Sequence, residues 1–420
     1  MTEAPILDVV VVGAGQAGLG IGYYLREASR DFVILERARI GETWRSQRWD
    51  SFALNTPNWM NGLPGAHYDG LAPDEFWRKD ELVESFEQYV DRFSLPVRTG
   101  ANVQSVRAGA EPGTFKVEYE GAGTARTIAT RNVVVASGIM QSPRIPQIKD
   151  DFPEWITHLH TGDYRNPAQL PDGAVLVVGS GQSGCQIVED LVAAGRTVFL
   201  CTSKVGRLPR RYRGRDILAW WNEMGFLDVR VTDLEDPAAT RAAQPQISGL
   251  GRYGHTVSLQ MMADQGVVLL GRATSVEGDT LLVDDSLAMH LRFGDERSAE
   301  FKRNIDEYIE RSGVEAPAPE VDPADVPQPT LGLTEPIRRL DLHAEGIRTV
   351  IWSTGFTADF SWIDAPVQDP DGAPIHERGV SPTPGLYFLG FPWLSSRKSG
   401  IVLGIESDAE YIADCIAERL

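Results

Sequence analysis

The sequence has 420 residues, of which 42% are hydrophobic and 24% charged, with a formal net charge of -19 and an isoelectric point near 4.8. This length suffices for two globular domains. The acidic balance argues against nucleic acid or an anionic membrane as a partner, because the long-range field of the protein repels polyanions.

A strand, a glycine-rich turn, a helix and a second strand are predicted over residues 6–37, "ILDVVVVGAGQAGLGIGYYLREASRDFVILER". The run Val9–Val12 is typical of a parallel strand that is covered on both faces. The turn matches the Gly-x-Gly-x-x-Gly fingerprint of dinucleotide-binding folds, whose glycines allow a tight turn, close approach of a pyrophosphate, and packing of helix on strand. The expected cofactor contacts are Gly13, Gly15, Gln16, Ala17 and Gly18.

An acidic residue ends the second strand of this unit. Glu36 lies 23 residues after Gly13 and is followed by Arg37. A carboxylate at this place accepts hydrogen bonds from ribose hydroxyls. The first unit is therefore predicted to bind a dinucleotide with an unmodified adenosine ribose, with Glu36 and Arg37 at the site.

Further along, a helix with one apolar face is predicted over residues 80–93 and a strand ending at Gly138, followed by a linker. The strand–turn–helix–strand pattern then returns over residues 173–204, "GAVLVVGSGQSGCQIVEDLVAAGRTVFLCTSK". Two such units predict an α/β fold with two Rossmann-like dinucleotide-binding domains. The expected contacts in the second copy are Gly179, Gly181, Gln182 and Ser183.

The second copy differs from the first at the end of its second strand. The position 23 residues after Gly179 is Thr202, and a basic run, "KVGRLPRRYRGRD", follows over residues 204–216. Hydroxyl groups and cations bind a ribose 2′-phosphate, which a carboxylate would repel. The second unit is therefore predicted to prefer NADPH, although most charge runs are solvated loops. The predicted phosphate contacts are Ser203, Lys204, Arg207, Arg210 and Arg211, whereas Arg213 and Arg215 have no assigned role.

The rest of the chain contains few other signals. A proline-rich acidic stretch over residues 316–329 indicates a surface connection, and a helix is predicted over 408–420. The three cysteines are far apart, which indicates no disulfide framework and fits a reducing cytoplasm. We see neither a signal peptide nor an apolar run long enough to span a bilayer, and no metal-ligand cluster.

The two fingerprints, "GETWRSQRWD" and "NTP" after the first unit, and the later segments "VVVASG", "VIWSTGF" and "GLYFLGF" together resemble the class B flavin-dependent monooxygenases. This family includes flavin-containing monooxygenases and YUCCA-type enzymes. The resemblance extends over nearly the whole chain. It implies a discontinuous FAD domain, residues 1–145 and 331–420, and an inserted NADPH domain, residues 146–330, with a substrate-side insert. It also places Thr43, Trp44 and Arg45 along the FAD pyrophosphate and Gly390 in the segment that passes the flavin.

The resemblance implies three catalytic candidates. Asn55 matches the active-site asparagine of the family, although an asparagine is also favoured in a turn before Pro57. The family's linker motif has a phenylalanine, a glycine, a histidine, a hydroxyl residue and an aromatic residue. Here His160 and Tyr164 fit its second half, while the phenylalanine is two residues early and the glycine is missing. The resemblance implies that this histidine and tyrosine couple the two domains as NADPH binds.

The expected activity is that of an NADPH-dependent FAD monooxygenase, which uses molecular oxygen to oxygenate a heteroatom or an electron-rich carbon of a small organic substrate through a peroxyflavin. Two alternatives stay open: a non-oxygenating NAD(P)H-dependent flavin oxidoreductase, and a flavin-binding regulatory protein. A disulfide reductase of the thioredoxin reductase type is excluded, since the sequence has no Cys-x-x-Cys pair. A homodimer is compatible with the sequence, which does not specify the oligomeric state.

Overall fold

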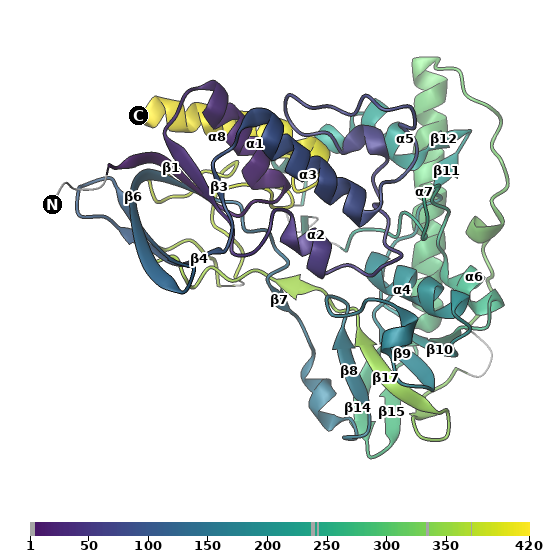
Figure 1. The fold of residues 1–420 in the computed structure, drawn as a ribbon. Coiled ribbons are helices and arrows are strands. Elements are labelled where there is room, and N and C mark those ends of the chain that lie inside the picture. The colour runs from purple at the N-terminus through teal and green to yellow at the C-terminus, as the bar shows by residue number, and fades with distance from the viewer. Residues whose placement is uncertain (1–4, 237–239, 242, 333–335, 371) are drawn as a thin grey trace.

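The computed structural model describes residues 5–236, 240–241, 243–332, 336–370 and 372–420. The fold has two α/β parts, each built on its own parallel sheet core, so the predicted fold class is confirmed (Figure 1). Within the described residues, no helix combines the length and the apolar composition needed to cross a membrane.

The first sheet has seven strands, and its centre is the first strand of the chain. Strand β1 pairs in parallel with β2 on one side and β6 on the other, and its residues Val9–Val12 are buried. This burial on both faces explains the continuous run of valines. The strand order is β3 (Val97–Arg98), β2 (Phe32–Leu35), β1 (Leu7–Val12), β6 (Thr124–Val135), β5 (Phe115–Gly121) and β4 (Ala101–Ala108), with β19 (Leu386–Phe388) also paired to β6.

Helix α1 packs on strands β1 and β2 of this sheet, and two further helices pack against α1. Helix α1 follows the first fingerprint and contacts both α3 and the C-terminal helix α8 (Figure 1). The C-terminal helix α8 thus packs against the N-terminal helix α1, although hundreds of residues separate them in the sequence. Their bounds are α1 (Gln16–Glu27), α3 (Lys79–Phe93) and α8 (Val402–Arg419).

The second sheet is parallel throughout, and its strands show that one domain boundary lies elsewhere than expected. Strand β17 pairs with β9 and β8, so the chain is still part of the second sheet as far as Trp352. The boundary expected at residue 331 is therefore wrong and lies after Trp352. The strand order is β13 (Val268–Leu270), β10 (Val198–Cys201), β9 (Ala174–Val178), β17 (Ile347–Trp352) and β8 (Thr157–His160), with α4 (Gln182–Ala193) and α6 (Leu259–Asp264) beside it.

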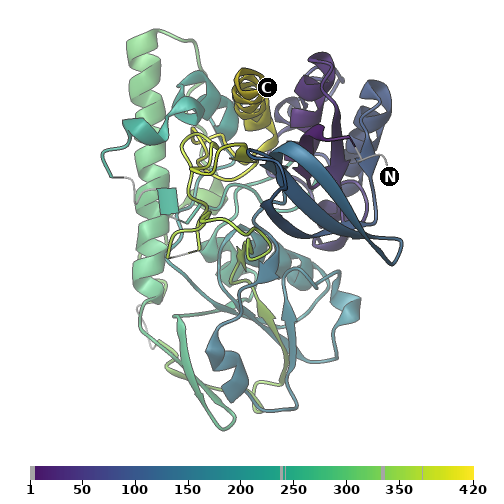
Figure 2. The same cartoon turned by 90° about the vertical axis from the view of Figure 1, so that its left-hand side faces the viewer.

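The two parts are joined by a pair of linkers. The chain leaves the first sheet through β7 (Ser142–Pro143) and returns through β18 (Phe356–Thr357), and these two short strands pair antiparallel. A long helix, α7 (Leu287–Ser312), runs along one side of the molecule (Figure 2).

The other elements are short and lie mostly in the connections. The remaining strands are β11 (Arg211–Tyr212), β12 (Arg215–Asp216), β14 (Ala273–Glu277), β15 (Thr280–Val283) and β16 (Arg339–Asp341). The remaining helices are α2 (Glu42–Ser46), α5 (Ile217–Glu223) and the 3-10 turns at Asn58–Met60, Gln147–Asp151, Pro167–Gln169, Phe226–Asp228, Val231–Asp233 and Pro323–Asp325.

Candidate functional site

The first fingerprint has the backbone geometry that requires glycine. Gly13 has a φ of +108°, and a Cβ atom there would lie 2.5 Å from the carbonyl oxygen of Ala136. A Cβ atom at Gly18 would lie 1.8 Å from the Gly13 oxygen, whereas one at Gly15 would have no atom within 4 Å. The outer glycines thus allow strand, turn and helix to pack, and the middle one leaves open space at the N-terminus of α1.

A cavity of about 460 Å³ opens in front of this turn. Besides residues of the loop after β6, it brings together most of the residues predicted for the first cofactor. Gly18 and Arg45 do not line it: Gly18 packs on the turn, and Arg45 pairs with Glu87 at 2.5 Å. The predicted residues that line the cavity are Gly13, Gly15, Gln16, Ala17, Glu36, Arg37, Thr43, Trp44 and Gly390.

Glu36 is held rigidly on the wall of the cavity. Its side chain is buried, with the residue 8% exposed. Its Oε2 accepts a hydrogen bond of 2.9 Å from the Ala14 N–H, and its Oε1 accepts one of 2.9 Å from the Ala38 N–H. Two backbone donors therefore fix the carboxylate at the end of β2, where a ribose acceptor is needed.

Arg48 is a cavity residue that our sequence reasoning did not single out. Its guanidinium lies 4.8 Å from the ring centre of Trp44 and 5.3 Å from that of Phe52, and it donates to the Gln47 carbonyl oxygen and the Met140 sulfur. No carboxylate pairs with it among the described residues, and burial lowers the pKa of Arg48 to about 10. The motif "GETWRSQRWD" contains this arginine, but only the structure distinguishes it from Arg45.

The second fingerprint repeats the geometry of the first. Gly179 has a φ of +107°, and a Cβ atom there would lie 2.4 Å from the Ser353 carbonyl oxygen. A Cβ atom at Gly184 would lie 2.0 Å from the Gly179 oxygen, and one at Gly181 would have no atom within 4 Å. The N-terminus of α4 is thus shaped for a phosphate like that of α1.

The side chains that follow the second fingerprint differ in exposure. Ser183 is exposed at the start of α4. Gln182 instead binds a neighbouring chain segment, because its Oε1 accepts a hydrogen bond of 2.7 Å from the Ile247 N–H. The Gln182 Nε2 also donates to the Ser248 carbonyl oxygen. Of the two predicted contacts, Ser183 is therefore the one whose side chain is free of such a bond to the neighbouring segment.

At the end of β10, two of the predicted phosphate contacts stay accessible. Thr202 points inward, with its hydroxyl 2.7 Å from the Leu270 carbonyl oxygen. Ser203 is half-buried, and Lys204 is exposed with its Nζ 4.8 Å from the Phe293 ring centre. Thr202 therefore occupies the position of Glu36 in the first module, and Ser203 and Lys204 follow it directly in the chain.

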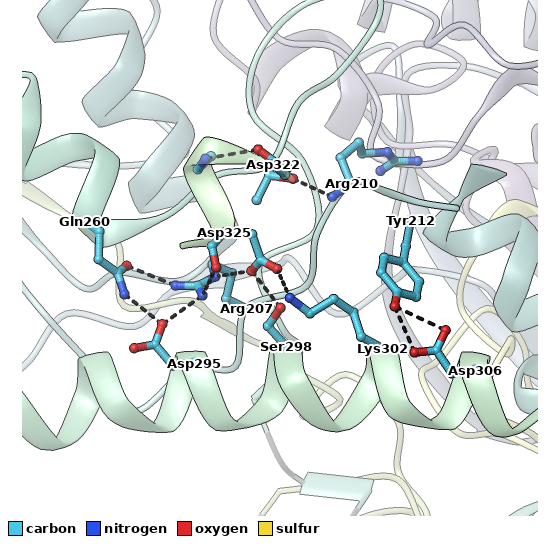
Figure 3. A network of polar contacts seen from close by, with 12 residues as sticks. Arg207, Arg210, Tyr212, Gln260, Asp295, Ser298, Lys302, Asp306, Asp322 and Asp325 are labelled. Atoms are coloured by element: carbon cyan, nitrogen blue, oxygen red, sulfur yellow. Dashed lines mark hydrogen bonds and ion pairs between the residues drawn. The ribbon is translucent and has the colours of Figure 1, made fainter. Parts of the chain in front are cut away.

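Arg207 requires a correction. The residue is 2% exposed, and its Nε lies 3.0 Å from Oδ1 of Asp325. Asp295 also pairs with it at 2.8 Å, and Gln260 accepts a hydrogen bond of 3.0 Å (Figure 3). Lys302 binds the other Asp325 oxygen at 2.6 Å. The prediction that Arg207 binds a phosphate is wrong, because two internal carboxylates already neutralise its charge.

The same correction applies to Arg210. The residue is 1% exposed, and its Nε donates a hydrogen bond of 2.8 Å to Oδ2 of Asp216. Its guanidinium also lies 4.3 Å from the ring centre of Phe76. Arg211 is exposed but donates to the carbonyl oxygens of Tyr253 and Gly254, at 2.7 and 3.3 Å. Arg210 thus belongs to the protein interior, and Arg211 serves to hold a loop.

The two arginines without an assigned role are ion-paired. The Arg213 Nε lies 2.6 Å from Oδ1 of Asp306 in helix α7, and Arg215 pairs with Glu223 in helix α5. Tyr212 also donates to Asp306, at 2.9 Å (Figure 3). Most of the basic run therefore fastens the chain to α5 and α7.

His160 and Tyr164 are engaged within the linker. The His160 residue is 2% exposed; its Nδ1 accepts from the Gly162 N–H at 3.2 Å, and its Nε2 lies 2.9 Å from the Gly355 carbonyl oxygen. Burial lowers the pKa of His160. Tyr164 is buried and donates to Oδ2 of Asp190 at 2.7 Å. A catalytic contact for either side chain stays a prediction, and the polar atoms of both already have partners.

Asn55 lies where the two parts of the molecule meet. Its side-chain oxygen accepts a hydrogen bond of 3.1 Å from Gln186 Nε2, and its main-chain oxygen accepts one of 2.9 Å from Arg210 Nη1. Both donors follow the second fingerprint in the chain. The structure therefore joins the asparagine that the sequence indicated to the second module.

Comparison with known proteins agrees with this arrangement. Residues 10–223 match the family model described as pyridine nucleotide-disulphide oxidoreductase. An uncharacterized CzcO-like oxidoreductase from Geobacillus kaustophilus is 32% identical over 98% of each chain. The chain belongs to the pyridine nucleotide-disulphide oxidoreductase family. The prediction of a flavoprotein oxidoreductase is thereby confirmed.

Two further comparisons confirm the resemblance to class B flavin monooxygenases. The indole-3-pyruvate monooxygenase YUCCA1 of Oryza sativa is 29% identical over 60% of this chain and 61% of its own. A solved flavin-containing monooxygenase from Stenotrophomonas maltophilia is similar in fold, with a TM-score of 0.66 and 18% identity over 99% of both chains.

The three cysteines of this chain are all free thiols. Cys185 and Cys201 are buried, and burial raises the pKa of both thiols, that of Cys201 to about 12. A thiol in that state is a poor nucleophile. In the described part of the chain, histidine, cysteine and carboxylate side chains also form no group of three that could hold a metal ion.

Proposed function

We propose that the protein is an NADPH-dependent FAD monooxygenase that oxygenates a heteroatom or an electron-rich carbon of a small organic substrate. The carrying observation is the pair of geometrically equal fingerprints, whose second strands end differently. The first is followed by the fixed carboxylate of Glu36, and the second by Thr202, Ser203 and Lys204 with no carboxylate among them. One module therefore suits an unmodified ribose and the other a phosphorylated one.

FAD occupies the cavity of the first module. The open space at Gly15 takes the pyrophosphate, Glu36 binds the ribose, and Trp44 and Gly390 line the remainder. Arg48, which pairs with no carboxylate among the described residues, would place its positive charge beside a ligand that carries two negative charges. When bound, FAD supplies both hydride acceptance and oxygen activation, and the protein residues bind and orient it.

NADPH occupies the second module. Gly181 leaves room for its pyrophosphate, and the exposed Lys204 and half-buried Ser203 bind its 2′-phosphate. Asn55 lies at the junction with the first module, where a hydride donor and the flavin have to meet. The name of the rice relative, a monooxygenase, supports oxygenation in preference to simple flavin reduction.

The test follows electrons and oxygen together. The purified FAD-loaded protein is given NADPH, a panel of amines, sulfides and 2-oxo acids, and ¹⁸O-labelled oxygen gas. We expect a substrate-dependent rise in NADPH consumption and a product that carries one labelled atom. If every NADPH consumed appears as hydrogen peroxide with each substrate class, the protein is a non-oxygenating flavin oxidoreductase and the proposal is wrong.

A further inference from the structure

Gln186 connects the second fingerprint to Asn55. It lies on α4 one turn after Gln182, on the helix whose N-terminus is shaped for the second dinucleotide. The residue is 1% exposed. Its Nε2 lies 3.1 Å from Asn55 Oδ1, 3.2 Å from the Ser248 carbonyl oxygen and 3.4 Å from the Gly249 carbonyl oxygen. A single amide group thus touches three oxygen atoms from two distant segments.

These contacts fix which way the Gln186 amide points. Only its NH₂ group can face three acceptors, because the opposite orientation would put its oxygen against the two carbonyl oxygens. Those carbonyl oxygens belong to the main chain, so they can only accept hydrogen bonds. The two main-chain acceptors therefore fix the position of the Gln186 nitrogen, whichever way the Asn55 amide is turned.

The orientation of Asn55 follows from that of Gln186. Because the Gln186 nitrogen donates, Asn55 has to present its oxygen to it. The Asn55 NH₂ group then points away from Gln186, and no residue in the described part of the chain accepts a hydrogen bond from it. The Arg210 guanidinium holds the main chain of the same residue, so the whole asparagine is constrained.

We propose that Gln186 is the positioning residue of Asn55, and that it orients the Asn55 amide so that Nδ2 donates a hydrogen bond to an acceptor oxygen of a bound ligand. This proposal rests on the proposed function, because the ligand is either the nicotinamide cofactor or the organic substrate. The chemistry is the same for both, since each has to offer a carbonyl-type or hydroxyl-type oxygen. The role of Gln186 is indirect: it acts through Asn55.

The proposal is tested with a double-mutant cycle of Gln186→Met and Asn55→Ala in the FAD-loaded protein. We measure NADP⁺ affinity by calorimetry and the KM for the organic substrate. One lost hydrogen bond is expected to weaken the affected ligand about three- to tenfold. Gln186→Met should have this effect in the wild-type background and none in the Asn55→Ala background. Additive losses in the double variant would overturn the proposal.

Two further variants separate positioning from general loss of packing. Asn55→Asp keeps the oxygen that faces Gln186 and replaces the Nδ2 donor, so it should keep the unfolding midpoint and weaken the ligand as Asn55→Ala does. Gln260→Met removes another buried amide, whose hydrogen bonds go to Arg207 and Asp295 and not to Asn55, and should leave ligand affinity unchanged. If Gln260→Met also weakened ligand affinity in the wild-type background and not in the Asn55→Ala background, the positioning role of Gln186 would be contradicted.

The readouts also identify the ligand. A loss in NADP⁺ affinity assigns the acceptor oxygen to the cofactor, and a loss confined to the KM of the organic substrate assigns it to that substrate. A loss in neither refutes the inference. Because NADP⁺ affinity needs no turnover, a protein that couples Gln186 to Asn55 in binding but forms no oxygenated product would refute the proposed function and leave this inference standing.

Discussion

Replacing Arg210 by alanine should destabilise the protein and not specifically impair NADPH recognition. The substitution leaves the Asp216 carboxylate buried without its partner, and breaking a buried pair in this way costs about 3–5 kcal/mol. It also removes the stacking on Phe76 and the donor to the Asn55 carbonyl oxygen. A loss of this size is a large part of the total stability of an ordinary domain.

A second substitution tests whether the loss comes from the unpaired charge of Asp216. Asp216 also caps helix α5, since its Oδ1 accepts a hydrogen bond of 2.9 Å from the Leu218 N–H. Asparagine is an equally good N-cap residue but has no charge. Arg210→Met combined with Asp216→Asn should therefore be more stable than Arg210→Met alone, because no charge is left unpaired.

The assay combines urea denaturation of each variant with the KM for NADPH and for NADH. We expect a lower denaturation midpoint for Arg210→Ala and a similar change, if any, in both KM values. An unchanged midpoint together with a raised KM for NADPH alone would show that the guanidinium faces the 2′-phosphate, and our reasoning from burial would be refuted.

Three other substitutions give separate expectations. Lys204→Ala should raise the KM for NADPH about tenfold without affecting the KM for NADH or the denaturation midpoint. Charge-assisted hydrogen bonds contribute roughly 1.5–3 kcal/mol, and the bond of the exposed Lys204 should lie at the low end of that range. Equal effects on both cofactors would show that Lys204 does not contact the 2′-phosphate. Arg48→Met should weaken FAD binding to the deflavinated protein at least about tenfold in a fluorescence titration. It should not destabilise the apoprotein, because a half-buried cation without a carboxylate partner is costly. Unchanged FAD affinity would argue against a cofactor contact. A hydrogen bond to Glu189 raises the pKa of His255, so the stabilising contribution of His255 is complete below about pH 6.5 and is lost as the pH rises through the raised pKa. The denaturation midpoints of wild type and His255→Ala should therefore differ at pH 6 and converge at pH 9. A difference that grew with pH would contradict the raised pKa.

The sequence was sufficient where the structure depends on neighbouring residues. The backbone of each fingerprint is set by glycines within six positions, so the special φ of Gly13 and Gly179 follows from the motif alone. The positions of Glu36, Ser203 and Lys204 also follow from the local sequence, because the length of the preceding strand places each of them at the carboxyl end of that strand.

Features that depend on distant segments could not be read from the sequence. The partner of Arg207 is Asp325, which lies 118 residues later in the chain, and no residue near the arginine indicates that this carboxylate will pair with it. Strand β17 ends in the apolar run Val350–Trp352, which would suit a buried parallel strand of either sheet, so its composition does not indicate which sheet it joins. Counting cations located the basic run correctly, but burial decides which of them can meet a ligand.

The paired linkers β7 and β18 have a mechanical consequence. Two crossings bonded to each other restrict the relative rotation of the modules more than a single crossing would. A swing that separated the modules would have to release Ser51 from Asp190 and Asn55 from Gln186, whose hydrogen bonds measure 2.7 and 3.1 Å. The Asn55 amide therefore belongs to the contact between the modules, and its hydrogen bond to Gln186 would be lost if they separated.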